Sequence, residues 1–193
     1  MNRSSGGSAV PNPNAAARFQ NADAYELLMG RWSRRLAPLL IRFGGLADGD
    51  RVLDVGCGTG SLAFTLPEIA NVAEVTGIDL TEPYLEFACA RNSDPKTNFR
   101  QADAQALPFE DNSFDRAFSM LVLQFIPDAA RAVAEMRRVV RHGGTVTAAI
   151  WDVYGGDAAY PSDLGYRRCA RSVHRAVFDQ TIERTERIGD PVD

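Results

Sequence analysis

Short apolar runs and amphipathic stretches alternate along most of this 193-residue chain. Runs of about five residues rich in Val, Ile and Leu are typical of strands buried on both faces, whereas apolar residues three or four positions apart are typical of helices. Residues 15–45 have the helical spacing, and Gly44 and Gly45 act as its stop. The expected strands are 51–55, 73–78, 98–101, 115–119 and 145–150, and the expected helices between them are 60–66, 82–91 and 128–141.

This order of elements predicts a Rossmann-like α/β fold, with a doubly wound, mostly parallel sheet and helices on both of its faces. At 193 residues the chain can bury one core and is too short for two full α/β domains. Ligands of such sheets bind outside the carboxyl ends of the strands. Three acidic residues, Asp54, Asp79 and Asp103, stand at or just after successive strand ends. We therefore expect a polar rim for a hydroxyl-rich ligand at one edge of the sheet.

Composition narrows the choice of partners. The net charge is −4 and there is no run of Lys or Arg, so the chain lacks the basic surface of a nucleic-acid binder, and a small molecule is the expected partner. The cysteines Cys57, Cys89 and Cys169 are odd in number and widely spaced, which predicts a reducing compartment and no metal site. No apolar run approaches the ~20 residues of a membrane span and the start lacks a signal-peptide core, so we expect a cytoplasmic protein.

The segment 52–60 carries the strongest signal. A short apolar strand runs into Gly56, Gly58 and Gly60, which supply tight turning and let a ligand approach the backbone where a Cβ would collide. A helix from Ser61 would point its free N–H groups at the same place and favour negative charge there. Read from Gly58, the segment also fits the dinucleotide fingerprint G-x-G-x-x-G/A, so a nicotinamide-dependent oxidoreductase has to be considered.

The acidic residues have specific expected roles. Asp79 can accept both hydroxyls of a ribose, the alternative being a cap of the next helix, for which Thr81 is also available. Asp103 can accept the exocyclic amine of an adenine while Leu80 covers a ring face, the alternative being a turn Asp. Asp54 can hold N–H groups of the glycine loop or reach a ligand's ammonium.

These residues together resemble the class I S-adenosylmethionine-dependent methyltransferases, most closely their type 11 domains. The glycine loop resembles the first motif of the family, Asp79 the acidic end of its second strand, and Asp103-Ala104 its adenine motif. Further motifs, 107–109 with 112–115 and 135–139 with 143–144, resemble the entries to its fourth and fifth strands. Five ordered motifs are far more specific than one glycine signature, and they decide against the oxidoreductase.

The resemblance implies that the cofactor is S-adenosylmethionine and that residues 15–152 form the cofactor-binding methyltransferase domain, with lid helices in 15–45. Tyr25, Arg31 and Trp32 could close the site from these helices or could be core residues. Gln124 stands where relatives often carry a His, and because Gln cannot act as a general base near neutral pH, acid–base help there is doubtful. The implied cofactor-binding residues are Asp54, Gly56, Cys57, Gly58, Gly60, Asp79, Leu80, Asp103, Ala104, Ser119 and Met120, and the acceptor-side candidates are Gln124 and Tyr25.

The ends of the chain depart from the family. Residues 1–14 are rich in Ser, Gly, Asn and Pro and are expected to be a disordered leader. Residues 153–193 form an atypical tail in which Tyr166, Ala170, Val173 and Val177 have helical spacing. A one-base shift in a back-translation of 157–167 gives a sequence that resembles the usual continuation of the family, so the tail is either helical or out of frame. The closing hairpin is then incomplete or absent, and the sheet edge left exposed could pair in a homodimer.

The resulting hypothesis is a methyltransferase that uses S-adenosylmethionine to methylate a small molecule. A second hypothesis is a module that binds S-adenosylmethionine without turnover, because the part of the chain that would shape the acceptor site is short. The nicotinamide-dependent oxidoreductase is the third and weakest.

Overall fold

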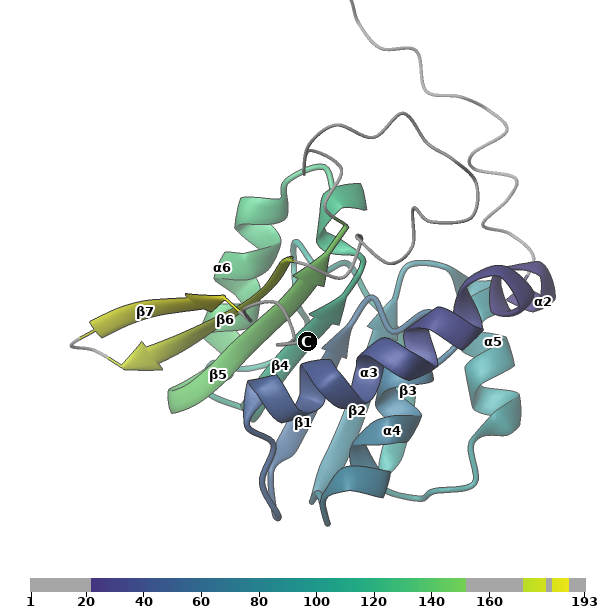
Figure 1. The fold of residues 1–193 in the computed structure, drawn as a ribbon, viewed down its shortest axis with the longest axis horizontal. Helices are drawn as coiled ribbons and strands as arrows, with labels where there is room; N and C mark the ends of the chain where they lie inside the picture. Colours follow the sequence, from purple (N-terminus) through teal and green to yellow (C-terminus); the bar gives the residue numbers. More distant parts are fainter. Residues whose placement is uncertain (1–21, 152–171, 180–181, 188–193) are drawn as a thin grey trace, which may run out of the picture.

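The computed structural model describes residues 22–151, 172–179 and 182–187. These residues form a seven-stranded sheet in the order β3-β2-β1-β4-β5-β6-β7 (Figure 1). Strands β1 to β5 pair in parallel, as predicted, and β6 and β7 are antiparallel. The strands are β1 (Arg51–Val55), β2 (Glu74–Asp79), β3 (Thr97–Gln101), β4 (Phe114–Met120), β5 (Val140–Ile150), β6 (Ser172–Asp179) and β7 (Ile182–Arg187).

The helices lie close to the predicted ranges. Within the predicted segment 15–45, three helical pieces follow one another without a break from residue 22, and the predicted leader 1–14 lies outside the described residues. In the part of the chain that the structure describes, no helix combines the length and apolar character needed to cross a membrane. The helices are α2 (Ala22–Tyr25), the π-helix η1 (Glu26–Gly30), α3 (Arg31–Gly44), α4 (Ser61–Ile69), α5 (Glu82–Arg91), the 3-10 helix η2 (Leu123–Phe125) and α6 (Ala129–Val139).

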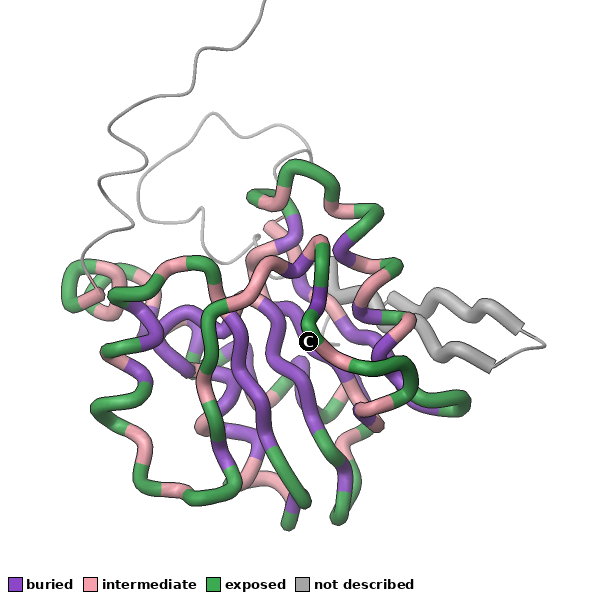
Figure 2. Tube along the Cα trace, turned by 180° about the vertical axis from the view of Figure 1, so that it is seen from behind, coloured by how far each residue is buried: buried purple, intermediate pink, exposed green. Residues whose placement is uncertain are grey.

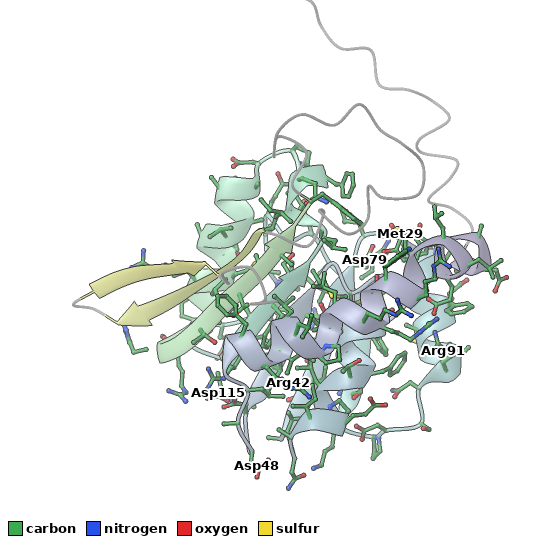
Figure 3. All side chains as sticks on the ribbon, viewed as in Figure 1. Met29, Arg42, Asp48, Asp79, Arg91 and Asp115 are labelled. Atoms are coloured by element: carbon green, nitrogen blue, oxygen red, sulfur yellow. The ribbon has the colours of Figure 1, made fainter. Side chains whose placement is uncertain are left out.

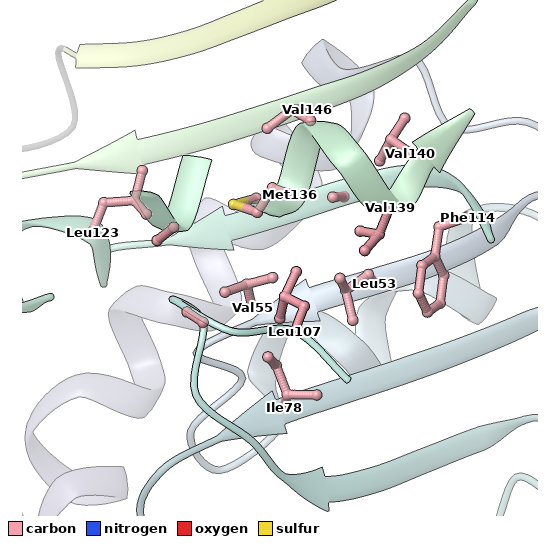
Figure 4. Packing of buried hydrophobic residues seen from close by; sticks show 13 residues of the cluster. Leu53, Val55, Ile78, Leu107, Phe114, Leu123, Met136, Val139, Val140 and Val146 are labelled. Carbon is pink, nitrogen blue, oxygen red and sulfur yellow. The ribbon is translucent and has the colours of Figure 1, made fainter. Parts of the chain in front are cut away.

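Two hydrophobic clusters lie on the two faces of the sheet. One packs α3 and α4 against the sheet, and Val52 of β1 belongs to it. The other packs α6 against the opposite face and includes Leu53 and Val55 of β1 (Figure 4). Because side chains alternate along a strand, Asp54 projects to the same face as Val52, toward α3 and α4. The central strands β1 and β2 are buried except at their ends, whereas exposed residues follow the helix surfaces and loops (Figure 2).

The strand order places a crevice at the carboxyl end of the sheet. Strand β1 pairs with β2 on one side and β4 on the other. The chain leaves β1 into α4 on one face and approaches α6 on the other face after β4. Connections that diverge in this way form the ligand site of doubly wound sheets. The sheet therefore brings the ends of β1, β2, β3 and β4 to one place.

Two element boundaries in the later part of the chain differ from the prediction. The helix predicted over 128–141 ends at Val139, and the strand predicted from residue 145 begins at Val140 with a register shift between Phe114 and Arg116 of β4. Gly144 lies so close to β4 that an added Cβ would be 2.4 Å from the Asp115 carbonyl oxygen. Early pairing with β4 thus replaces the last turn of the expected helix.

The tail is also not helical where it is described. Its residues 172–187 contain the antiparallel strands β6 and β7, so the prediction of a terminal helix is wrong there, as is the prediction that the closing hairpin is incomplete or absent. Val173 and Val177 suit a strand as well as a helix, and β5 supplies the partner that the isolated sequence does not reveal. Because β6 covers β5, the reason for expecting a homodimer through that edge disappears. Residues 157–167 lie outside the described residues, so the frame of the tail stays a hypothesis.

Candidate functional site

The glycine loop after β1 is held against β2. Its backbone turns at Gly56, whose φ is +74°, and the N–H groups of Gly56 and Cys57 both donate to the Ile78 carbonyl oxygen at 2.8 and 2.9 Å. A Cβ added to Gly56 would lie 2.4 Å from Cγ1 of Val122, which comes from the segment after β4. A larger residue at position 56 would therefore both strain the backbone and push against the opposite wall of the crevice.

The same loop opens α4. Gly60 is the N-cap residue of this helix. Its backbone is in the left-handed conformation, with φ +87°, and no side chain at this position accepts a hydrogen bond from the helix. The first N–H groups of α4 consequently face the loop without a side-chain acceptor from the cap residue. Cys57 does not take part in this polar edge, because its sulfur is 3.0 Å from a Cβ placed on Gly77 of β2, and burial raises the pKa of its thiol. Cys57 is a packing residue in the present structure.

Asp79, at the end of β2, is bound to the glycine loop and to the start of α5. Its Oδ2 accepts the N–H of Gly58 at 2.9 Å, and its Oδ1 accepts the N–H of Thr81 at 2.8 Å. Each carboxylate oxygen has a further lone pair, so both can still accept hydroxyl groups. Thr81, and not Asp79, occupies the N-cap position of α5. Asp79 is therefore not the N-cap of α5, and its role toward a ligand stays a prediction.

Asp54, at the end of β1, is fully buried and its Oδ2 has no hydrogen-bond partner. Burial, and then the charge of Asp79, raise the pKa of Asp54 to about 7, although a hydrogen bond from the Ala63 backbone lowers it. Beside it lies a small void of about 10 Å³, lined among others by Tyr25, Ser33 and Met120. A cationic group placed here would neutralise the carboxylate and satisfy the free oxygen.

Asp103, just after β3, is held by Gln105. Its Oδ1 accepts the backbone N–H of Gln105 at 2.8 Å and the side-chain amide at 3.2 Å. These hydrogen bonds lower the pKa of Asp103. Ala104 is buried and lies in the cavity wall next to it. The Asp103 carboxylate is therefore ionised near neutral pH and can accept a ligand donor.

A cavity of about 420 Å³ is lined by Gly56, Gly58, Asp79 and Asp103, whereas Asp54 lies outside its lining. Asp79, Thr81, Asp103 and Gln105 lie on its β2–β3 side. The other side comes from the segment between β4 and α6 and is apolar. Its residues are Leu121, Val122, Phe125, Ile126 and Pro127. Leu80 and Phe125 border the cavity while remaining 61% and 63% exposed, so they stand at its mouth.

Tyr25 projects from α2 over the glycine loop. Its ring atom Cε1 would be 3.7 Å from a Cβ on Gly58, and its ring lies 4.9 Å from that of Tyr84 on α5, centroid to centroid. Burial, and then the charges of Asp79 and Glu26, raise the pKa of Tyr25 to about 12. Tyr25 therefore keeps its proton near neutral pH and acts as a wall rather than as a base.

Glu26 fastens this helical segment to the loop. Its carboxylate accepts the hydroxyl of Thr59 at 2.8 Å and pairs with Arg34, and Arg91 of α5 lies 3.7 Å away. Figure 3 shows Arg91 and Met29 on this side of the molecule, near the end that carries Asp79. Arg31 and Trp32 do not line the cavity and instead stack on each other, with the guanidinium 4.9 Å from the ring centroid.

Six of the predicted site residues do not line the large cavity, namely Asp54, Cys57, Gly60, Ser119, Met120 and Gln124. Ser119 is completely buried with an unpartnered hydroxyl, and Met120 borders the small void by Asp54. Gln124 is exposed, and its side-chain amide donates to the Leu121 carbonyl oxygen at 2.9 Å. Tyr84, Gln105 and Val122 line the cavity although the sequence analysis did not single them out. Only the position of Gln105, two residues after Asp103, could have signalled it, because such a residue can bind the Asp side chain.

The fold and this site define a Rossmann-like protein built to hold a nucleotide-derived cofactor. Residues 53–148 match the methyltransferase domain family, and the chain belongs to the S-adenosylmethionine-dependent methyltransferases. S-adenosylmethionine is the methyl donor of this family. The matched range includes the glycine loop and the acidic residues Asp54, Asp79 and Asp103, and membership of this family sets aside the oxidoreductase.

Curated relatives match part of this chain, and two of those described here are named methyltransferases. An uncharacterised protein of Mycobacterium tuberculosis is 36% identical over 133 residues, which are 68% of this chain and 48% of the relative. Demethylmenaquinone methyltransferase of Staphylococcus aureus and phosphatidylethanolamine N-methyltransferase of Cereibacter sphaeroides are each 39% identical over 104 residues, covering 53% and 52% of this chain and 43% and 50% of theirs. The chain spans about half the length of the curated relatives it matches.

Solved structures resemble the chain in the same region. An S-adenosylmethionine-dependent methyltransferase of Mesorhizobium loti is 30% identical with a TM-score of 0.55, covering 59% of this chain and 52% of its own. The [4+2]-cyclase SpnF is 34% identical with a TM-score of 0.58, covering 64% and 48%. A methyltransferase structure from Haloferax volcanii, solved with the Trm112 activator, is 25% identical with a TM-score of 0.65, covering 69% and 58%.

Proposed function

We propose that this chain binds S-adenosylmethionine in the cavity at the carboxyl end of the sheet and transfers its methyl group to a small-molecule acceptor. The observation that carries the proposal is the division of the cavity into a polar side, with Asp79 and Asp103, and an apolar side after β4. The residues present fit the cofactor. Gly56 leaves no room for a Cβ, and the buried Asp54 carboxylate has a free oxygen for a cation.

Each polar group has one part of the cofactor to hold. Asp79 would accept the ribose hydroxyls while its bonds to Gly58 and Thr81 keep the loop in place. Asp103 would accept the adenine amine, and Asp54 would face the ammonium of the methionine arm. The cofactor supplies a methyl group that its sulfonium already activates. The described residues therefore contribute mainly positioning and exclusion of water.

The side of the cavity that would hold the acceptor is apolar, and neither Tyr25 nor Gln124 is suited to act as a base there. Tyr25 keeps its proton near neutral pH, and Gln124 does not line the cavity and donates its amide to the Leu121 carbonyl oxygen. The named relatives act on demethylmenaquinone and phosphatidylethanolamine, which offer different atoms to the methyl group. We accordingly propose only a small-molecule acceptor with an apolar part that packs on Val122 and Phe125. The cytoplasmic location stays a prediction.

A second candidate is a chain that binds S-adenosylmethionine without transferring its methyl group. The likeness to the [4+2]-cyclase SpnF supports this candidate, because that protein has a similar fold and is named for a cyclisation instead of a methyl transfer. Release of S-adenosylhomocysteine with any member of a panel of quinols, amines and phenols would exclude this candidate. Binding without release across the whole panel would favour it.

The first test is calorimetric titration with S-adenosylmethionine and S-adenosylhomocysteine. We expect Asp79→Ala to weaken binding about a hundredfold, or about 2.7 kcal/mol. Asp48→Ala is the matched control, because Asp48 also accepts a backbone N–H, that of Asn71 at 2.8 Å, but lies at the opposite end of the sheet (Figure 3). Failure of the folded wild-type chain to bind either compound would contradict the proposal.

A further inference from the structure

Gln105 joins the two sides of the cavity. Its side-chain Nε2 donates to Asp103, at 3.2 Å from Oδ1 and 3.4 Å from Oδ2, while its Oε1 accepts the backbone N–H of Asp128 at 3.1 Å. Asp128 is the N-cap of α6 and directly follows the apolar wall that ends at Pro127. One amide side chain therefore contacts both the polar residue after β3 and the end of the apolar wall after β4.

The contacts determine the orientation of this amide. Asp103 is a carboxylate and requires a donor, and the Asp128 N–H requires an acceptor, so the nitrogen must face Asp103 and the oxygen Asp128. Arg131 adds a third link, because its Nε donates to the Gln105 carbonyl oxygen at 2.7 Å and its own backbone N–H binds the Asp128 side chain at 2.9 Å. Gln105 is thus held from α6 on both its side chain and its backbone.

The two oxygens of Asp103 are left unequal. Oδ1 receives the backbone N–H of Gln105 at 2.8 Å and its amide at 3.2 Å, whereas Oδ2 has only the longer contact at 3.4 Å. The carboxylate is only partly buried, so packing alone does not set its rotamer. With Oδ1 occupied, Oδ2 is the oxygen that presents free lone pairs to a ligand.

We propose that Gln105 is a positioning residue that aims Asp103 Oδ2 at the adenine amine and couples this recognition to the apolar wall of the acceptor side. The inference rests on the proposed function, since it takes Asp103 as the adenine contact. A cofactor that orders Asp103 would, through Gln105 and the Asp128 N–H, also order the end of the wall against which the acceptor packs. Cofactor binding would in this way prepare the acceptor side of the cavity.

The first experiment measures base selectivity. Wild type, Gln105→Glu and Asp103→Ala are titrated with S-adenosylhomocysteine and with its purine analogue, in which hydrogen replaces the exocyclic amine. Gln105→Glu keeps the size of the side chain and the acceptor for Asp128 but replaces the donor to Asp103 with a repelling carboxylate. We expect it to weaken binding of S-adenosylhomocysteine roughly tenfold, the scale of one hydrogen bond to a charged group, and to leave the analogue within about twofold.

A control variant, Asn98→Asp, and the double variant Asp103→Ala/Gln105→Glu distinguish the positioning role of Gln105 from a purely structural role. Asn98→Asp adds the same charge on β3 at an exposed position outside the cavity wall, and it should leave the ratio of the two affinities unchanged. In the Asp103→Ala background, Gln105→Glu should have no further effect on that ratio. Equal weakening of both ligands by Gln105→Glu would overturn the positioning role.

The second experiment tests the coupling. Hydrogen exchange of peptides that cover 121–128 is measured with and without S-adenosylhomocysteine. We expect the ligand, at saturation, to slow this exchange in wild type. We expect no slowing in Gln105→Glu, which loses the link to Asp103, or in Gln105→Met, which loses both the donor and the acceptor. The same slowing in Gln105→Met would overturn the coupling. If wild type binds neither ligand, the proposed function fails instead, and if it binds both equally, only the adenine role of Asp103 and this inference fail.

Discussion

Asp54 and Asp79 lie on the same face of neighbouring parallel strands, close enough for the charge of Asp79 to add to the effect of burial on Asp54. Together these effects raise the pKa of Asp54 to about 7. No group among the described residues donates a hydrogen bond to Oδ2 of Asp54. The pair therefore forms a site whose charge is poorly compensated until a cation enters, and this has measurable consequences.

The first concerns the pH dependence of cofactor binding. An ammonium pairs with the ionised form of Asp54, so affinity for S-adenosylhomocysteine should fall about tenfold between pH 8 and pH 6 as Asp54 takes up a proton. Calorimetry at several pH values measures this. 5′-Methylthioadenosine lacks the amino acid arm and should show little change over the same range. An equal fall for both ligands would place the titrating group elsewhere.

The second concerns the stability of the ligand-free chain. The folded-state pKa of Asp54, about 7, lies above the ordinary value of 3.8, so between these values the folded chain holds a proton that the unfolded chain has lost. Its contribution to stability is therefore present below about pH 4 and is lost as the pH rises to about 7. Asp54→Asn should therefore raise the free energy of unfolding by about 2–3 kcal/mol more at pH 8 than at pH 5. Urea unfolding at both pH values provides the measurement, and equal effects at both would contradict it.

The third prediction separates backbone strain from steric clash in the glycine loop. Gly56 and Gly49 both have positive φ, +74° and +81°, but a Cβ on Gly49 meets nothing within 4 Å, whereas one on Gly56 meets Val122. Gly49→Ala should cost about 1–2 kcal/mol of stability and leave binding intact. Gly56→Ala should in addition weaken S-adenosylhomocysteine binding by roughly tenfold or more. Adding Val122→Ala should restore part of it, and no restoration would argue against the clash.

The fourth tests the attachment of the N-terminal helices. Glu26→Gln weakens the contacts to Thr59 and Arg34, so Tyr25 should cover the glycine loop less tightly. We expect the dissociation rate of S-adenosylhomocysteine to rise about tenfold, as for loss of one charged hydrogen bond. Stopped-flow competition measures the rate. Glu68→Gln, on the exposed side of α4, is the control and should dissociate like the wild type; an unchanged rate in Glu26→Gln would show that the attachment does not limit release.

Much of the fold follows from local patterns. The parallel strands and their helices lie near the predicted ranges because apolar runs and helical spacing are properties of short segments. Asp54, Asp79 and Asp103 could be placed at one edge for the same reason, since the carboxyl ends of parallel strands meet there. Strands β6 and β7 could not be predicted in this way, because their formation depends on pairing with β5 and with each other.

The sequence by itself determined that the glycine loop and the residues Asp54, Asp79 and Asp103 lie at the carboxyl end of the sheet. Strand ends and glycine turns can be recognised from short stretches of sequence. Only the tertiary structure decided how these groups act on one another. It left Oδ2 of Asp54 without a hydrogen-bond partner among the described residues, kept Gln124 out of the cavity lining, and brought Gln105 between Asp103 and Asp128. These outcomes depend on burial and on contacts between residues far apart in the chain, and no short stretch of sequence contains that information.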